Sequence, residues 1–387
     1  MSERQPLFFI DNLRIALIAL VIAHHAGQAY GPTGGFWYFE NPERASILGA
    51  FFVVNRSFFM SLFFMVSGYF LPASYDRKGA SAFLADRLRR LGVPLLVFFF
   101  VVFPVMMYTY YLNFRHYGHI PFLRYYSQVY FGRGTRPLDW SGPNWPDANF
   151  GHLWFVEHLL VFALCYAIWR LIRPPMARID SNGERPPRNL EILAFTLALT
   201  AVTFVVRIWY PIDKWIAFLK FIQVAFADVP RDLSFFVIGI IAYRRNWFLN
   251  MPKKTGKVWL LIGLAAAACY YGSFLLGHPY FSGGGLNVRS LVYAFWEAFL
   301  CTGLCIGFLV FFRENLNSQG TLARNLAAST YAVYLFHVPV VVFLQYAIWH
   351  TEMAAITKFA IVTLAAIPLT FLISSYIRRL PHVRRVL

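Results

Sequence analysis

The sequence predicts an all-α protein, a polytopic transmembrane helical bundle of about ten spans with both termini in the cytoplasm. The first observation is composition: 58% of the 387 residues are hydrophobic, 19% are aromatic and only 14% are charged. Soluble domains carry roughly 25% charged residues, so this chain has too little polar surface to stay dispersed in water. The mean hydropathy of +0.52 agrees. The simplest solvent for such a chain is a lipid bilayer.

The second observation is the length of the apolar runs. A helix needs roughly 20 mainly apolar residues to cross a bilayer. About ten runs meet this condition, at 8–30, 47–71, 93–113, 152–173, 190–210, 231–246, 257–277, 288–312, 325–349 and 355–377. The sixth is the shortest, and 215–227 is apolar enough to predict an interfacial or re-entrant helix. We expect one transmembrane domain over 1–387 with a short basic tail at 378–387.

The third observation is charge. The net charge is +17, from 35 Lys and Arg against 18 Asp and Glu. A basic chain is one signature of nucleic-acid binding, but here the basic residues stand in short clusters between apolar runs. With the N-terminus inside, the cytoplasmic segments hold roughly twice as many Lys and Arg as the opposite side. The partner predicted by this pattern is a lipid bilayer and not nucleic acid. The four cysteines have no zinc-site spacing, and we expect no metal.

The first span contains Asp11, Arg14 and His25 in an otherwise apolar helix. Intramembrane ionisable residues are costly and are functional candidates by default. At about 100° per residue these three share one face, whereas His24 points about 100° away from His25. Arg14 and His25 lie about 16 Å apart along the axis, so they are no compact dyad. We expect an Asp11–Arg14 ion pair near the inner end and a deeper His25 suited to take a proton from a hydroxyl.

Other interpretations of the same residues remain open. Asp11 and Arg14 would also serve as anchors at the membrane interface, and His25 as a hydrogen-bonding residue between helices. A transporter or exporter of a glycan or a small anionic solute would likewise line a path with buried charges. The two halves of the chain show no sequence symmetry of the kind that many transporters have.

Five segments resemble, in order, motifs of the acyltransferase-three family of membrane O-acyltransferases. They are Asp11-x-x-Arg14 with His25, Phe63-Phe64-x-x-Ser67-Gly68-Tyr69, Arg87-x-x-Arg90, His152-Leu153-Trp154-Phe155 with Glu157, and Tyr331-x-x-Tyr334-Leu335-x-His337-x-Pro339. The motifs fall within 8–340, nearly the whole chain. The chain resembles polytopic members without a soluble esterase-like domain, and periplasmic glucan succinyltransferases are among the nearer relatives.

The resemblance implies transfer of an acyl group (acetyl, succinyl or similar) from cytoplasmic acyl-CoA to a hydroxyl. The implied acceptor is a carbohydrate or glycolipid of the cell envelope, at or beyond a bacterial inner membrane. Acyl-CoA would be a donor substrate, with no permanently bound cofactor. The resemblance implies that Arg14 and His25 are essential and that Arg87 and Arg90 also take part. We predict that Asp11, Arg14 and His25 are catalytic and that Arg87 and Arg90 bind the donor.

Physical reasoning agrees with the donor assignment. Arg87 and Arg90 are three apart, on one face at an expected helix start, where forked guanidinium groups and free backbone N–H groups bind phosphate. Ordinary anchoring by positive charges at the cytoplasmic face is the alternative. His25 would act as general base or carry the acyl group itself, and the sequence does not separate the two. The supporting or acceptor-side candidates are His337, Tyr334, Glu157, Trp154, His152 and Ser67. Arg56 and Glu297 are charged residues within apolar runs, and no role is assigned to them.

Overall fold

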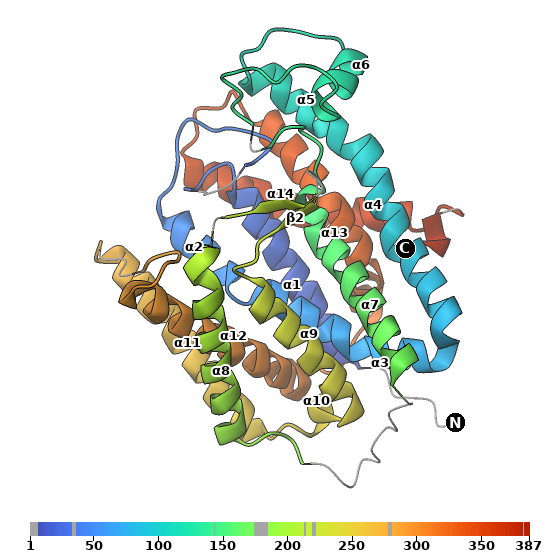
Figure 1. Cartoon of the computed structure of the whole chain (residues 1–387), viewed down its shortest axis with the longest axis vertical. Coiled ribbons are helices and arrows are strands. Elements are labelled where there is room, and N and C mark those ends of the chain that lie inside the picture. The colour runs from blue at the N-terminus through green and yellow to red at the C-terminus, as the bar shows by residue number, and fades with distance from the viewer. Residues whose placement is uncertain are drawn as a thin grey trace.

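The computed structural model describes residues 7–32, 36–142, 144–173, 185–212, 214–218, 222–277, 281–381 and 383–387. Within these ranges the chain is a helical bundle with one two-stranded hairpin, which confirms the predicted all-α class (Figure 1). The helical elements are α1 (Phe8–Gly27), α2 (Ile47–Arg56), α3 (Phe59–Arg87), η1 (Leu88–Gly92), α4 (Val93–Val97), η2 (Phe98–Val102), α5 (Phe103–Phe114), α6 (Phe122–Tyr125), η3 (Tyr126–Tyr130), η4 (Gly151–Leu153), α7 (Trp154–Ile172), α8 (Asn189–Trp209), α9 (Val229–Arg244), α10 (Trp247–Asn250), α11 (Lys253–Leu275), α12 (Val288–Asn315), α13 (Thr321–Ala347), α14 (Ala355–Ile377) and η5 (Val383–Arg385).

Eight helical segments in the described part of the chain are long and apolar enough to cross a membrane. One of them, Ile47–Phe114, contains two of the expected spans. The expected span at 231–246 corresponds to α9, which is only 16 residues long. The protein is therefore a multi-pass integral membrane protein, while the number of spans and the side of each terminus stay predictions.

The segment 215–227 differs from its prediction. It contains the antiparallel hairpin of β1 (Ile216–Phe218) and β2 (Ile222–Val224) in place of an interfacial or re-entrant helix. β-Branched and aromatic side chains favour a strand over a helix, and the apolar content alone did not distinguish the two. Non-helical backbone at membrane depth is tolerated where it lines a cavity, and Trp215 beside this hairpin lines one.

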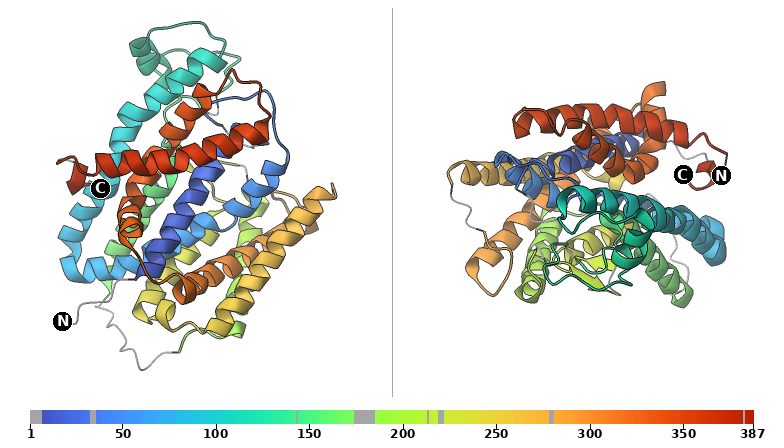
Figure 2. Two further views of the ribbon diagram at one scale, coloured as in Figure 1. Left: turned by 180° about the vertical axis from the view of Figure 1, so that it is seen from behind. Right: turned by 90° about the horizontal axis from the view of Figure 1, so that it is seen from above.

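Helix α1 is surrounded by other helices. It packs against α12, α13 and α14 and also contacts α2 and α3. Seen from behind, α14 lies across α1 and α13 (Figure 2). This packing places much of a helix with an ionisable face inside the bundle, where protein can supply partners for polar side chains.

Helices α3 and α9 approach each other closely. A Cβ added at Gly68 would overlap the carbonyl oxygen of Phe236, and one added at Gly239 would overlap that of Met65. Small residues allow such backbone contact between membrane helices, so Gly68 has a packing role next to Ser67. Farther along, Gly79 breaks α3 with φ 73° and ψ 171°, a left-handed conformation that favours glycine.

Residues 115–150 form a cap at one end of the long axis, at the top of Figure 1. Two hydrogen bonds of 2.5 and 2.9 Å join the guanidinium of Arg115 to the carboxylate of Asp147, and both side chains are fully buried. The hydroxyl of Tyr125 donates to the same carboxylate at 2.8 Å. Asn149 then accepts from the backbone N–H of Gly151 at 2.8 Å. The cap thereby fixes the backbone that enters η4.

Candidate active site

Three histidines from distant parts of the chain meet inside the bundle. His25 lies in the last turn of α1, His337 lies within α13, and His152 lies in η4 just before α7. The ring centroid of His337 is 4.9 Å from that of His25 and 4.9 Å from that of His152. The tertiary structure thus brings together three predicted site residues, two of which are 312 positions apart.

Hydrogen bonds indicate which nitrogen of His25 carries the proton. Nδ1 of His337 lies 2.7 Å from the carbonyl oxygen of Tyr334, so this nitrogen is the protonated donor. Nε2 of His337 then accepts a hydrogen bond from Nδ1 of His25 at 2.8 Å. In neutral His25 the remaining nitrogen, Nε2, consequently has the free lone pair. That is the atom suited to accept a proton.

A second set of contacts orients the His25 ring. The indole of Trp37 stacks on it with centroids 5.6 Å apart and an interplanar angle of 12°. Trp37 donates through Nε1 to the side-chain oxygen of Gln345 at 2.7 Å, and Gln345 donates to the backbone oxygen of Ala26 at 3.1 Å. Because Ala26 adjoins His25, this chain of bonds holds both the ring and its backbone. Trp37 and Gln345 belong to no motif, and sequence reasoning missed them.

A cavity of about 500 Å³ adjoins the histidines, and we name it the histidine cavity. His24 also lines this cavity, although it was expected to point about 100° away from His25, and the two imidazole centroids are 5.7 Å apart. His152 donates through Nε2 to the backbone oxygen of Leu335 at 3.0 Å, which leaves its buried Nδ1 as a lone pair without a protein partner. The charged and polar lining residues are His24, His25, Gln28, Arg56, His152, His158, Asp228, Arg231 and Asp232.

A second cavity, of about 350 Å³, is lined by Arg14, Arg87, Arg90 and Ser67, and we name it the arginine cavity. The predicted pair is present, with Nη1 of Arg14 3.3 Å from Oδ1 of Asp11. The expectation that Arg14 accompanies Arg87 and Arg90, away from His25, is confirmed by their common cavity. Three guanidinium groups in one small cavity make a site for an anion.

The expected helix N-terminus at these arginines is wrong. Arg87 ends α3, and Arg90 lies in the π-helical turn η1. The break at Gly79 places the helix start about 10 Å before Arg87, so the free N–H groups of the first turn lie elsewhere. The guanidinium of Arg87 instead lies 5.1 Å above the ring of Phe83, and its buried Nε has no protein partner. Single π-helical turns are common at functional sites.

Tyr334 lines both cavities. Its hydroxyl donates to the backbone oxygen of His152, and its own backbone oxygen accepts from His337. Its ring packs edge-on against Phe155, with centroids 5.5 Å apart. One residue thus forms part of the wall between the two cavities and also anchors two of the histidines.

Of the remaining predicted candidates, Trp154 lines a cavity and Glu157 does not. Trp154 lines the histidine cavity, and its backbone oxygen lies 2.7 Å from Nδ1 of His158. Glu157 is buried, lines neither cavity, and its Oε2 has no hydrogen-bond partner in the described structure. Among the described residues, Glu157 makes no ion pair with Arg14 or Arg56. Nowhere in that part of the chain do three or more His, Cys, Asp or Glu side chains gather as metal ligands.

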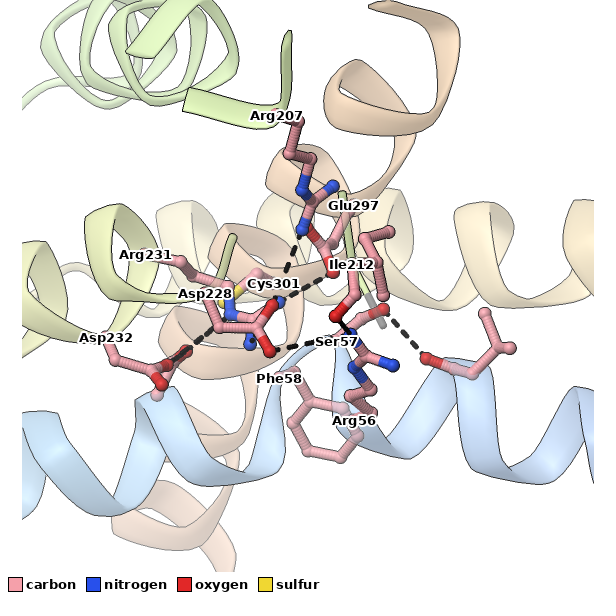
Figure 3. Close-up of polar contacts among 12 residues, drawn as sticks. Arg56, Ser57, Phe58, Arg207, Ile212, Asp228, Arg231, Asp232, Glu297 and Cys301 are labelled. Atoms are coloured by element: carbon pink, nitrogen blue, oxygen red, sulfur yellow. Dashed lines mark hydrogen bonds and ion pairs between the residues drawn. The ribbon is translucent and has the colours of Figure 1, made fainter. Parts of the chain in front are cut away.

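A buried network of charges extends from the histidine cavity (Figure 3). Glu297 accepts from Arg207 at 2.5 Å and from Arg231 at 2.6 Å. Asp232 accepts from Ser61 at 2.6 Å. Oδ1 of Asp228 lies 3.3 Å from Nη2 of Arg231 and 3.5 Å from Nη2 of Arg207. Its Oδ2 lies 3.6 Å from Nη2 of Arg56. Arg56 and Glu297, which had no assigned role, thus belong to one network.

The signal that could have located this network was available in the sequence. Arg207, Arg231, Asp232 and Glu297 lie inside or beside apolar runs and are buried, and buried charges require partners. Asp228 lies in the loop before α9. Burial raises its pKa, but the charges of Arg231, Arg56 and Arg207 outweigh burial and hold that pKa below its usual range. Asp228 is therefore ionised at neutral pH.

An all-α membrane bundle with a histidine-lined and an arginine-lined cavity on either side of Tyr334 has the features that a membrane transferase of two substrates requires. The acyltransferase-3 family model, described as an acyltransferase domain, matches residues 7–378. The chain belongs to this family and is a membrane O-acyltransferase.

The relatives make the likeness more specific. The chain is 23% identical over 358 residues to the glucans biosynthesis protein C of Escherichia coli O81, covering 88% of this chain and 83% of that protein. Proteins of the same name from Escherichia coli strain SMS-3-5 and Shigella dysenteriae serotype 1 are 23% identical over 355 residues. No solved structure matches the chain significantly. Family membership favours the enzyme over the transporter or exporter.

Proposed function

We propose that this protein moves an acyl group from cytoplasmic acyl-CoA to a hydroxyl of a carbohydrate or glycolipid at or beyond a bacterial inner membrane. The single observation that carries the proposal is the pair of cavities that share Tyr334 as a wall. One cavity offers three arginines for an anionic donor, and the other offers a histidine with a free Nε2 for a hydroxyl.

Coenzyme A fits the arginine cavity by charge. Its phosphates are anions that guanidinium groups bind in forked, charge-assisted hydrogen bonds. Arg14, Arg87 and Arg90 would hold the phosphate end, and the long pantetheine arm would carry the thioester past Tyr334. The donor and acceptor are thereby held at opposite sides of one reaction point.

His25 would act as general base. Its Nε2 takes the proton of the acceptor hydroxyl as the oxygen attacks the thioester carbonyl. The carbon–sulfur bond then breaks, and the departing thiolate takes the proton from His25, which returns to its neutral form. His337 keeps the reactive nitrogen free by accepting from Nδ1. The same imidazole could first carry the acyl group itself, and rapid quenching with radiolabelled acyl-CoA would reveal acylated protein.

The acceptor class is supported by the relatives. Proteins named for glucan biosynthesis cover 88% of this chain, and a glucan presents the hydroxyls that the reaction requires. We therefore propose a glucan or related glycan as acceptor and acetyl- or succinyl-CoA as donor.

The test is transfer by the purified protein in lipid nanodiscs. The donors are acetyl-CoA and succinyl-CoA, and the acceptor is the glycan pool extracted from a host strain that lacks the gene. We expect free coenzyme A and a heavier glycan, both dependent on protein and acceptor. If no glycan gains mass with either donor, the proposal fails; glycan counterflow into proteoliposomes would then support the transporter.

A further inference from the structure

The three carboxylates of the buried network are not equally satisfied. Glu297 has two short bonds, at 2.5 and 2.6 Å, and Asp232 has one at 2.6 Å from Ser61. Among the described residues, the carboxylate of Asp228 has only long contacts, between 3.3 and 3.6 Å, although three arginines surround it. Charge-assisted hydrogen bonds are normally about 2.7–2.9 Å long. Asp228 therefore keeps capacity for closer hydrogen bonds.

The position of Asp228 in the chain supports the same conclusion. It is the N-cap residue of α9, where an aspartate usually accepts a hydrogen bond from the first turn, yet its side chain makes no capping bond. Asp228 lines the histidine cavity, and its side chain is 14% exposed. The side chain of Asp228 thus does not cap α9, and Asp228 borders the histidine cavity.

An independent polar atom points to a ligand in the same cavity. Nδ1 of His152 is buried without a hydrogen-bond partner among the described residues, and His152 is only 6% exposed. It is an acceptor, because Nε2 of the same ring donates to Leu335. A buried acceptor without a donor is costly, and a hydroxyl bound in the cavity would satisfy it.

Aromatic rings complete this wall of the cavity. Tyr270 and Phe281 stack with centroids 5.5 Å apart, and Phe281 and Tyr293 stack with centroids 4.9 Å apart. All three line the cavity, together with Trp154 and Trp215. An aromatic, largely apolar lining beside hydrogen-bond acceptors suits a sugar, whose C–H groups are apolar and whose hydroxyls donate.

We propose that Asp228 binds acceptor hydroxyls, and that Asp228 with the aromatic wall of Tyr270, Phe281 and Tyr293 forms a carbohydrate subsite of the histidine cavity. The inference deepens the proposed acyl transfer and rests on it. The arginines around Asp228 position its carboxylate and keep it ionised. Asp228 is then a specificity-determining residue, and His25 acts on a different hydroxyl of the same acceptor.

The test is the Asp228→Asn variant, purified in nanodiscs, with acetyl-CoA and succinyl-CoA as donors and the glycan pool of the gene-deleted strain titrated as acceptor. Asparagine keeps the shape and removes the charge. We expect kcat/KM for the acceptor to fall about 10- to 100-fold, with KM for acyl-CoA within about twofold of wild type. Asp228→Glu, which restores the charge, should recover part of the loss.

The matched control is Asp76→Asn. Asp76 is also shared by two arginines, Arg170 and Arg244, but it lines neither cavity. The Asp76→Asn variant should leave the KM for acyl-CoA and the KM for the acceptor unchanged. Hydrolysis of acyl-CoA without acceptor reports folding, so a loss of acceptor use with normal hydrolysis supports the subsite. Asp228→Asn with a wild-type acceptor KM, or with parallel losses in hydrolysis and transfer, overturns the subsite alone. Wild-type protein without any transfer overturns the proposed function and the subsite with it.

Discussion

The two cavities differ in their charge. The arginine cavity is lined by Arg14, Arg87 and Arg90, and no Asp or Glu is among its described lining residues. The histidine cavity balances Arg56 and Arg231 against Asp228 and Asp232. Three arginines, of which Arg14 pairs with Asp11, leave an excess of positive charge that favours an anion, whereas a balanced set of donors and acceptors suits a neutral polyol. The difference agrees with the proposal of an anionic donor and a neutral acceptor on either side of Tyr334.

The largest expected effect tests the chemistry of the histidine cavity. His25→Ala removes the proposed base and should lower the transfer rate by at least about 10²–10⁴-fold, measured as acylated glycan per inserted protein. The matched control is His24→Ala, which lines the same cavity but lacks the bond to His337 and should be milder. Near-wild-type product from His25→Ala would remove His25 from the mechanism.

The arginine cavity is tested next. Arg87→Ala combined with Arg90→Ala should raise the KM for acyl-CoA about 10- to 100-fold through lost charge-assisted hydrogen bonds, and change the acceptor KM far less. Titrating each substrate separately measures both. Arg89→Ala is the control, because Arg89 is 55% exposed and bonds to Asp86. Equal rises in both KM values would indicate misfolding and contradict the division of the two cavities.

A smaller effect should come from the orientation of His25. His337→Leu removes the acceptor for Nδ1 of His25, so the other tautomer gains population and kcat should fall about tenfold. His337→Gln, whose side-chain oxygen can accept the same proton, should restore part of kcat. The readout is kcat at saturating donor and acceptor, because a packing defect would not respond to glutamine. Identical kcat values for the two variants would count against a positioning role.

The last prediction concerns the side of the membrane on which each cavity opens, and it involves no change in activity. A reporter fused after Leu387 should read as cytoplasmic, because the basic segments of the chain are expected inside. Paired alkaline phosphatase and green fluorescent protein fusions measure this. A periplasmic signal would reverse the assignment of the arginine cavity to the cytoplasmic donor.

Short-range features were predictable because they depend on chain geometry alone. The Asp11–Arg14 pair is an i,i+3 contact, which helical periodicity dictates. The membrane class follows from composition, and the acyltransferase-3 family follows from five ordered motifs. The prediction of an interfacial or re-entrant helix at 215–227 was wrong, since an apolar segment without a clear period fits a helix as well as the strands β1 and β2 found there.

Only the tertiary structure decided the contacts between segments that are far apart in sequence. His25 and His337 lie 312 positions apart, and their motifs carry no information on which ring nitrogens meet. The sequence by itself determined that charges are buried, because apolar runs surround them. The packing of α2, α8, α9 and α12 decided which charges pair, because each burial cost is offset only by a specific partner. That packing also placed Asp228 at the histidine cavity. No local sequence pattern predicts this position, because the cavity is built from distant segments.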